Sequence, residues 1–448
     1  MKRILSICLV VLAGSAGLMA EEYSLQQAVN LALKQNAGLQ GVKYRVAASQ
    51  AQVTTVRGSL VPGLSVSGSA MRMSNLYNTS VSFLPVLDGT TFAPTGDVVP
   101  SGSVSADRVG NAYAGKLSAI WPIYTGGRVW QGYQITKLSR DISLQSYDSC
   151  QAKVVFDVKQ AYYDLLLAQS FNQVTQEAVT SIQKHVDRVK ALYQNGIVSK
   201  YDLLRAEVQL SNLQPRLIQT QNAVALAKQA LNMNLNRDLN GDIIPTDSMQ
   251  YLPVEVDSAA LKKAALETRP EYKSIILRQK IVDKAKLTSF AGYQPAISLL
   301  ADYTYYKGQG YTDIDKWQKT WDVGIAASWS LFDGGASIGK IREARANQNQ
   351  IRLAREQVED WIELEVTAGY LTMKASEKTI FSQQRSVEQA QEALKIAQAR
   401  YESGQATNLD VLDAQLALTQ AQTNRIQAVH DYLVSLAKLE KAAGITLK

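Results

Sequence analysis

The sequence has few of the residues that most enzymes and metal proteins use for chemistry. Its 448 residues include only two Cys and two His. This scarcity excludes a disulfide framework, a Cys-rich zinc site and a centre built from several His. Lys and Arg outnumber Asp and Glu, giving a formal net charge of +7, yet no dense basic run marks a nucleic-acid surface. We therefore predict no enzyme activity, no cofactor, no bound metal and no nucleic-acid partner.

Long apolar runs are equally scarce. The one clear run, residues 4–18, follows Lys2 and Arg3 and ends shortly before Ala20. This is the pattern of a secretory signal peptide, here predicted to span residues 1–20. An N-terminal membrane anchor is the alternative, although the run is short for crossing a bilayer. No later run is long enough to predict a transmembrane helix.

The rest of the sequence consists of two copies of one repeat. Residues 24–70 align without gaps on residues 233 positions later, and residues 117–235 align at an offset of 208. The offsets differ by 25, so the first repeat has 25 extra residues within 74–111. Because Gly, Pro, Ser and Thr are frequent there, we expect a long loop. Such self-similarity is the signature of a duplicated architecture.

Each repeat contains a segment with the composition of a very long helix. Residues 127–195 and 335–403 contain no Pro, and about 68 residues of helix span about 100 Å. Apolar residues recur there at coiled-coil spacing. They are Val179, Ile182, Val186, Val189 and Tyr193 in the first repeat and Val387, Ala390, Leu394, Ala397 and Tyr401 in the second, with Leu409, Leu412 and Leu416 continuing the series. Pro215, in the helix expected after Ser199, predicts a kink or a break.

Four other segments alternate apolar and polar residues with the period of a strand. They are residues 64–72, 115–123, 297–306 and 321–332. In the last of them Trp321 and Trp329 lie near the ends of the apolar face, which is typical of lipid-facing strands with aromatic girdles. A soluble sheet is the alternative. Four strands cannot close a barrel in lipid, where open edges are not tolerated, so the chain must oligomerise.

Four motifs connect these elements. The strand-to-helix junctions read WPIYTGGR (121–128) and WSLFDGGA (329–336), and the turns between paired helices read YQNGIVSKYDLLRAE (193–207) and YESGQATNLDVLDAQ (401–415). On these motifs and the duplicated plan, the chain resembles the TolC-like outer-membrane efflux proteins. The resemblance implies a mainly α fold with membrane β, internally duplicated. It implies four transmembrane β-strands per chain in a trimeric 12-stranded β-barrel, continued by a long periplasmic α-helical barrel.

The same resemblance divides the chain into segments. The first repeat runs from an equatorial segment with its first helix (21–61), through a strand pair with a long extracellular loop (62–124), to a long helical hairpin (125–236). The second runs from an equatorial linker with its first helix (237–294), through a strand pair (295–332), to a second hairpin (333–443). The signal peptide (1–20) and a C-terminal tail (444–448) complete the chain.

The resemblance also assigns roles at the two helical tips. The turns expected to contact an adaptor contain Gly196, Ser199, Gly404 and Thr407. The expected periplasmic aperture or gate comprises Tyr193, Asp202, Arg205, Tyr401, Asp410 and Asp413. In a trimer each aspartate becomes a ring of three, which attracts cations. Arg205 occupies the first-repeat position of Asp413, so a pair between these two residues is a candidate link in a closed state.

Several of these residues also have a purely structural interpretation. Ser199-x-x-Asp202 and Thr407-x-x-Asp410 are capping-box patterns, in which the aspartate serves a helix end. Asp413 lies one turn further on and is therefore the better gate candidate. Tyr193 and Tyr401 are interpreted first as packing residues of the helical seam and second as gating hydroxyls.

Glycine pairs follow the strands at both junctions, Gly126 with Gly127 and Gly334 with Gly335. Residues 334–340 nearly match the phosphate-binding pattern G-x-x-x-x-G-K, but the following Ile341 replaces the Ser or Thr that holds Mg²⁺. The first repeat does not preserve the pattern. We therefore interpret both glycine pairs as turns.

Together these features predict a passive, trimeric exit duct for efflux or type I secretion, in the outer membrane of a Gram-negative bacterium and extending into the periplasm. The resemblance implies a homotrimer in outer-membrane lipid, a periplasmic adaptor (membrane fusion protein) and an inner-membrane pump of the RND, ABC or MFS type. The alternatives are an adaptor protein and a non-conducting coiled-coil protein of the envelope. An adaptor would need a compact β-domain, and the polar face of residues 321–332 argues against a filled interior.

Overall fold

The computed structural model describes residues 21–73, 82–87, 94–101, 110–308 and 316–447. The predicted signal peptide lies outside these residues. The chain divides into two compact units. Unit 1 comprises Met1–Val42, Tyr147–Pro270 and Glu359–Lys448, and unit 2 comprises Lys43–Ser146 and Glu271–Val358.

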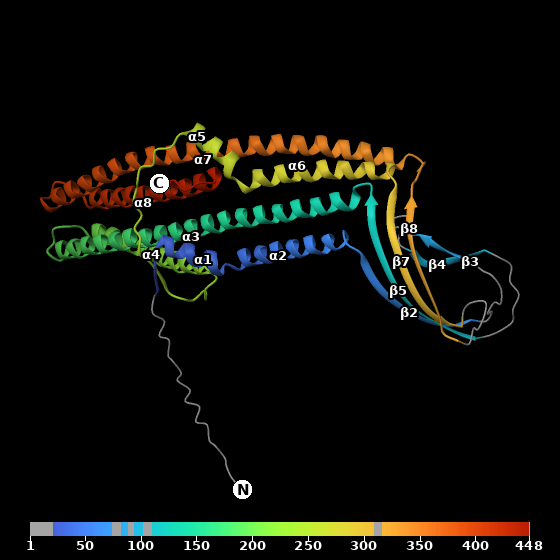
Figure 1. Cartoon of the computed structure of the whole chain (residues 1–448). Helices are drawn as coiled ribbons and strands as arrows, with labels where there is room; N and C mark the ends of the chain where they lie inside the picture. The colour runs from blue at the N-terminus through green and yellow to red at the C-terminus, as the bar shows by residue number, and fades with distance from the viewer. Residues whose placement is uncertain (1–20, 74–81, 88–93, 102–109, 309–315, 448) are drawn as a thin grey trace, which may run out of the picture. The chain divides into compact units, whose positions relative to one another are not determined.

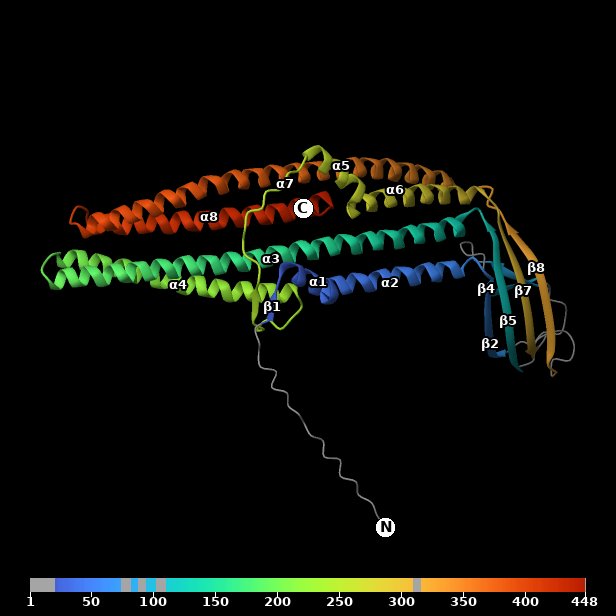
Figure 2. The same ribbon diagram turned by 60° about the vertical axis from the view of Figure 1, so that its left-hand side comes forward.

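Unit 1 is built on two helical hairpins, whose arms lie side by side in both views (Figures 1 and 2). In the first, α3 (Arg128–Gln194) is followed by α4 (Lys200–Asn234). In the second, α7 (Ala336–Glu402) is followed by α8 (Asn408–Ala443). The predicted long helices are confirmed, since α3 and α7 have 67 residues each. Residues of α3 and α7 belong to both units.

Shorter elements complete unit 1. They are β1 (Glu21–Tyr23), α1 (Leu25–Gln35), β6 (Ile243–Pro245) and α5 (Ser258–Thr268). β1 and β6 form a parallel pair. Side chains start the helices: Ser24 and Gln27 form a capping box for α1, and Asp257 accepts from the N–H groups of Ala259 (3.0 Å) and Ala260 (3.3 Å) at the start of α5.

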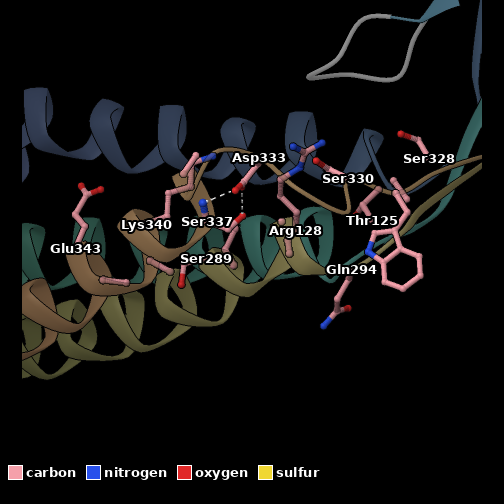
Figure 3. A pocket seen from close by; sticks show the side chains of 18 of the residues that line it. Thr125, Arg128, Ser289, Gln294, Ser328, Ser330, Asp333, Ser337, Lys340 and Glu343 are labelled. Atoms are coloured by element: carbon pink, nitrogen blue, oxygen red, sulfur yellow. Dashed lines mark hydrogen bonds between the residues drawn. The ribbon is translucent and has the colours of Figure 1, made fainter.

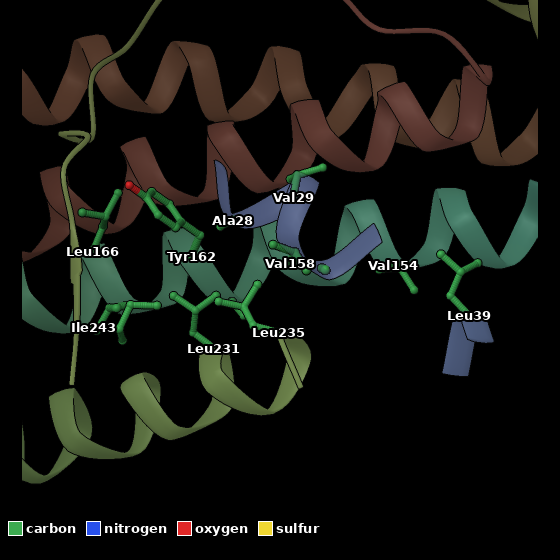
Figure 4. Packing of buried hydrophobic residues seen from close by; sticks show 13 residues of the cluster. Ala28, Val29, Leu39, Val154, Val158, Tyr162, Leu166, Leu231, Leu235 and Ile243 are labelled. Atoms are coloured by element: carbon green, nitrogen blue, oxygen red, sulfur yellow. The ribbon is translucent and has the colours of Figure 1, made fainter. Parts of the chain in front are cut away.

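The core of unit 1 repeats the duplication seen in the sequence. Apolar residues of both repeats are buried at positions 208 residues apart. The buried pairs are Val154 and Ile362, Val158 and Val366, Leu165 and Met373, and Leu231 and Leu439. Figure 4 shows the first-repeat cluster, in which α1, α3 and α4 contribute side chains around Tyr162. The Tyr162 hydroxyl donates to the Tyr23 carbonyl oxygen (2.9 Å) and accepts from the Asp247 N–H (3.2 Å), so its polar atom is satisfied.

Unit 2 contains a four-stranded antiparallel sheet with strand order β2-β5-β7-β8. Its strands are β2 (Gly63–Met73), β5 (Gly110–Thr125), β7 (Ala296–Lys307) and β8 (Gln318–Ser328). They connect to α2 (Ala37–Gly58), most of which belongs to unit 2, to α6 (Pro270–Ser289), and to the first turns of α3 and α7. A short 3₁₀ helix, η1 (Phe290–Tyr293), precedes β7.

One face of this sheet is apolar and exposed. Trp321 is 73% and Ile325 70% exposed, and they alternate along β8 with Asp322 and Gly324. The other edge strand, β2, exposes Val66 in the same way. The predicted alternation is therefore present in the structure, and β2 and β8 are the two open edges. Within the described residues, no helix combines the length and the apolar character needed to cross a bilayer.

The structure corrects the predicted end of one strand. β8 ends at Ser328, whereas the alternation predicted a strand to residue 332. Ser328 pairs with Ala296, the first residue of β7. The preceding Pro295 has no N–H, so the partner strand offers no further donor. The ladder therefore ends four residues earlier than the sequence pattern suggests.

The segment predicted as a long loop contains a second small sheet. β3 (Ser82–Leu87) and β4 (Pro94–Ser101) form an antiparallel pair with a register shift between Pro85 and Leu87. In a two-stranded sheet both strands are edges, so proline is tolerated there. The rest of the insertion lies outside the described residues.

The helical seam also differs from its prediction in part. Val179, Ile182, Val186 and Val189 are buried, but Tyr193 is 38% exposed. In α8, Leu412 is buried whereas Leu409 and Leu416 are exposed, because the buried face is formed by Val411, Gln415 and Leu418. α4 continues without a break through Pro215.

Candidate functional site

The candidate site lies at the tips of the two hairpins, where each long helix ends in the same way. In the first, the Gly196 N–H donates to the Tyr193 carbonyl (2.9 Å) and the Ile197 N–H to the Leu192 carbonyl (2.9 Å). In the second, the Gly404 N–H donates to Tyr401 (3.1 Å) and the Gln405 N–H to Arg400 (2.7 Å). This pair of bonds is the Schellman motif.

These turns require glycine because of their backbone conformation, and not because a side chain would clash with its neighbours. Gly196 has φ +74° and Gly404 has φ +72°, which side-chain-bearing residues rarely adopt. An added Cβ would meet nothing within 4 Å at either position. The turns are therefore sharp but uncrowded, and their surroundings are open.

A capping box begins the next helix at each tip, as the sequence predicted. The Asp410 carboxylate accepts from the Thr407 N–H (2.7 Å) and hydroxyl (2.8 Å), while the Asp410 N–H donates to the Thr407 oxygen (3.3 Å). Ser199 and Asp202 repeat this arrangement at α4. The hydrogen bonds from Thr407 hold the pKa of Asp410 below its ordinary value of 3.8. Asp410 is therefore ionised throughout the physiological range.

Polar contacts connect the two hairpins close to the tips. The His185 ring nitrogen Nε2 lies 2.6 Å from the Asn408 oxygen Oδ1, and the Asn408 amide donates to the Asp202 carbonyl (2.8 Å). Ser181 on α3 donates to Gln415 on α8 (2.6 Å). An ion pair joins Arg188 to Glu402. These contacts link α3 and α4 of the first repeat to α7 and α8 of the second.

Tyr401 lies at the centre of this group. Its ring packs against His185 with a centroid distance of 5.3 Å, and the side chain is buried. Burial, with the nearby Asp202 carboxylate, raises the pKa of the Tyr401 hydroxyl. Among the described residues this hydroxyl has no hydrogen-bond partner. Leaving such a group unpaired costs about 1–3 kcal/mol.

The predicted aperture residues are only partly brought together. Tyr401 joins the tip contacts, whereas its repeat partner Tyr193 is exposed and is not a seam residue within the chain. Asp410 and Asp413 are exposed, as expected of groups that face solvent. Within the described part of the chain, no ion pair or hydrogen bond links Arg205 to Asp413. That pair is therefore not formed within one chain.

Sequence reasoning missed two residues of the tip, His185 and Asn408. They are 223 residues apart in the chain. His185 stands out in the sequence only as one of two histidines, and Asn408 only as the residue after a predicted cap. No local pattern indicated that they meet.

The strand-to-helix junctions of unit 2 also repeat one contact. The indole N–H of Trp121 donates to the Leu60 carbonyl (3.1 Å), and that of Trp329 donates to the Tyr293 carbonyl (3.3 Å). All four junction glycines, Gly126, Gly127, Gly334 and Gly335, have positive φ and form turns. At Gly126 an added Cβ would also lie 2.9 Å from the Ala291 Cα, so space excludes a side chain there.

The phosphate-loop-like segment lines a cavity of about 710 Å³. Figure 3 shows Asp333 at the start of α7, accepting from the N–H (2.8 Å) and the hydroxyl (2.5 Å) of Ser337. The Gly335 N–H donates to the same carboxylate (3.1 Å). The helix start is thus occupied by the chain's own carboxylate, which would repel a phosphate. Within the described residues, no group of three or more His, Cys, Asp or Glu is placed to hold a metal ion.

Comparisons with known proteins agree on one family. The model of the family described as outer membrane efflux protein matches residues 28–237 and 263–445. The probable efflux pump outer membrane protein TtgC of Pseudomonas putida is 25% identical over 427 residues, covering 94% of this chain and 83% of the relative. The alkaline protease secretion protein AprF of Pseudomonas aeruginosa is 23% identical over 382 residues, covering 84% of this chain and 76% of the relative.

Solved structures agree in fold. The CmeC outer membrane channel of Campylobacter jejuni superposes with a TM-score of 0.77 at 19% identity, covering 94% of this chain and 85% of the other. The outer membrane protein VceC of Vibrio cholerae gives 0.77 at 17% identity, covering 95% and 97%. The mainly α architecture with a small sheet is therefore shared with outer-membrane channels.

Proposed function

Because this chain belongs to the outer membrane efflux protein family, we propose that it is a passive exit duct that carries small molecules or secreted polypeptides out of the periplasm. The relatives named above belong to an efflux pump and to a protease secretion system. The glycine-rich turn before α7 would not hold a nucleotide phosphate, since the Asp333 carboxylate fills the start of that helix. Energy then comes from an inner-membrane transporter of the RND, ABC or MFS type.

The sheet supports assembly into a homotrimer. β2 and β8 are open edges, and in lipid their unpaired N–H and C=O groups need partners. If β8 of one copy pairs with β2 of the next, three copies close a barrel of twelve strands, wide enough for a lumen. The exposed apolar side chains of Val66, Trp321 and Ile325 would then face lipid. The long hairpins would continue the duct into the periplasm.

The hairpin tips support the position of the aperture. Asp410 and Asp413 are exposed at the start of α8, and Asp410 is held in its charged form. Three copies would place rings of carboxylates around a narrow entrance, which favours cations over anions. A periplasmic adaptor would dock on the turns around Gly196 and Gly404, where the surroundings are open.

The observation that carries this proposal is the combination of an open-edged, lipid-compatible sheet and acidic hairpin tips in one duplicated chain. The test is single-channel conductance of the detergent-purified protein in planar bilayers. We compare the wild type, the double variant Asp410→Ala with Asp413→Ala, and the control Asp360→Ala, an exposed aspartate of α7 outside the tip. We expect small cation-selective openings that enlarge or lose selectivity only in the double variant.

Other outcomes would overturn parts of the proposal. Currents that are anion-selective, or that do not change in the double variant, would place the constriction away from the tips and leave Asp410 as a helix cap. A protein that never inserts would contradict the duct itself. The alternative would then be a non-conducting coiled-coil protein or an adaptor of the envelope.

A further inference from the structure

The two histidines of the chain join the same two helices at separate points. His185 on α3 contacts Asn408 on α8 through Nε2 and Oδ1 (2.6 Å). His430 on α8 contacts Asp164 on α3 through Nε2 and Oδ1 (2.7 Å). Asp164 and His185 are 21 residues apart, which is about 30 Å along a helix. The α3–α8 contact thus has a histidine near the tip and a second one well below it.

The surroundings of His185 oppose a positive charge on its ring. Asn408 uses its amide nitrogen to donate to the Asp202 carbonyl, so its oxygen accepts from the His185 Nε2–H. Burial lowers the pKa of His185 below its ordinary value of 6.5, and Arg188 on the same helix lowers it further. The hydrogen bond to Asn408 opposes this shift without cancelling it.

The other charged or titratable groups near His185 come from α7 and α4. α7 contributes Glu402, which pairs with Arg188, and Tyr401, whose ring packs on the imidazole. α4 contributes Asp202, whose carboxylate is engaged by Ser199 and not by the histidine. Nothing among the described residues accepts a hydrogen bond from His185 Nδ1. A second proton on the ring would therefore have no acceptor among the described residues.

The surroundings of His430 have the opposite effect. Burial lowers its pKa, but Asp164 on α3 and Asp431 beside it on α8 outweigh burial. Their carboxylates lie 2.7 Å and 3.1 Å from the two ring nitrogens. The net shift is upward from 6.5. Both ring N–H groups of the protonated histidine have a carboxylate acceptor.

We propose that the α3–α8 contact is an acid-sensitive hinge in which protonation of His185 releases the hairpin tips while protonation of His430 holds the same helices together below them. The sign follows from linkage. The tip contact is fully present above pH 6.5 and weakens as the pH falls below it. The contact between His430 and Asp164 is fully present below pH 6.5 and weakens as the pH rises through the raised pKa. Acid therefore loosens one end of the contact and strengthens the other.

This inference deepens the proposed function, because opening of the tips would widen the aperture of the duct. It can nevertheless be tested without any current. Amide hydrogen exchange of the full-length protein in detergent, corrected for the intrinsic pH dependence of exchange, reports the tip through residues 404–412 and the lower contact through residues 425–435. Between about pH 7.5 and about pH 5.5 we expect tip protection to fall, because protonation of the buried His185 weakens the tip contact. Protection of 425–435 should rise or stay unchanged.

Two variants separate the hinge from a general acid effect. His185→Gln keeps an amide donor toward Asn408 but cannot titrate, so its tip protection should no longer depend on pH. Arg188→Gln removes a cation beside the ring and should move the response to higher pH. A pH response of His185→Gln equal to that of the wild type would overturn the proposal. So would tip protection that rises on acidification.

The same variants in planar bilayers distinguish this inference from the duct. Wild-type open probability should increase on acidification, and that of His185→Gln should not. Normal channels whose exchange and opening ignore His185 would contradict the hinge alone. Acid-sensitive exchange at the tips of a protein that never conducts would contradict the duct and leave the hinge standing.

Discussion

Unit 1 and unit 2 bury their apolar side chains in opposite ways. In unit 1, Tyr162, Leu165 and its repeat partner Met373 are fully buried. In unit 2, the sheet presents Val66 and Ile325 to its surroundings. The first unit thus has an apolar core of its own. In the proposed assembly, lipid and further copies of the chain would cover the apolar face of the second unit.

The largest effect is expected when a buried core side chain of unit 1 is shortened. Leu165→Ala should destabilise the helical unit by about 2–5 kcal/mol, because a fully buried leucine leaves a cavity. Thermal unfolding followed by circular dichroism in detergent measures this. Ile325→Ala is the matched control in unit 2 and should have much less effect. Equal losses for the two variants would mean that the sheet face is packed within the chain after all.

A charge on the exposed face of the sheet tests the other side of the comparison. Ile325→Lys should hinder membrane insertion by about 2–4 kcal/mol, the cost of a lysine facing lipid near the middle of a membrane strand. Asp322→Lys places the same side chain on the opposite face of β8 and should insert normally. Insertion is measured by heat-modifiable electrophoresis of membranes. Normal insertion of Ile325→Lys would show that this face does not meet lipid.

At the tips, capping hydrogen bonds at the helix starts add to the packing of buried side chains. Thr407→Ala removes the cap of α8 and should cost about 1 kcal/mol. It should also let the pKa of Asp410 rise toward its ordinary value, because the Thr407 hydroxyl no longer donates to the carboxylate. Hydrogen exchange in the first turn of α8 reports the cap. Thr423→Ala, within the same helix, should leave that turn unchanged.

The smallest effect is expected for the pH dependence of unit 1. The raised pKa of His430 means that its bond to Asp164 contributes stability fully below pH 6.5 and loses it as the pH rises through that raised pKa. His430→Gln should therefore lower the melting temperature more at about pH 5.5 than at about pH 8.5, by a few degrees. A difference that is equal at both pH values would contradict the ionic character of this contact.

Much of the fold was predictable because short stretches of the sequence determine it. The absence of Pro over residues 127–195 predicts α3 almost to its ends, and Ser199 with Asp202 predicts the start of α4. The end of β8 was not predictable, because the apolar alternation continues to Leu331 although the partner strand stops at Ala296. Pairing between strands depends on the tertiary structure, so the sequence of one strand alone does not show where its ladder ends.

The candidate site shows the same division. Its turns and caps follow from Gly196, Gly404 and the residues just after them. The contact between His185 and Asn408 joins two repeats and could not be inferred from either. Duplication even misleads here, since Tyr193 and Tyr401 align in sequence but only Tyr401 is buried.

The two hydrogen bonds from the junction tryptophans are present in both repeats although the repeats differ in length. Donor and acceptor are 61 residues apart in the first repeat and 36 in the second. The bond survived although 25 residues were gained or lost between its ends. The segment between β2 and β5 is thus a natural insertion point that leaves the anchor undisturbed. A peptide tag or an affinity epitope added there should be accepted, while the same addition at Gly126 would meet Ala291.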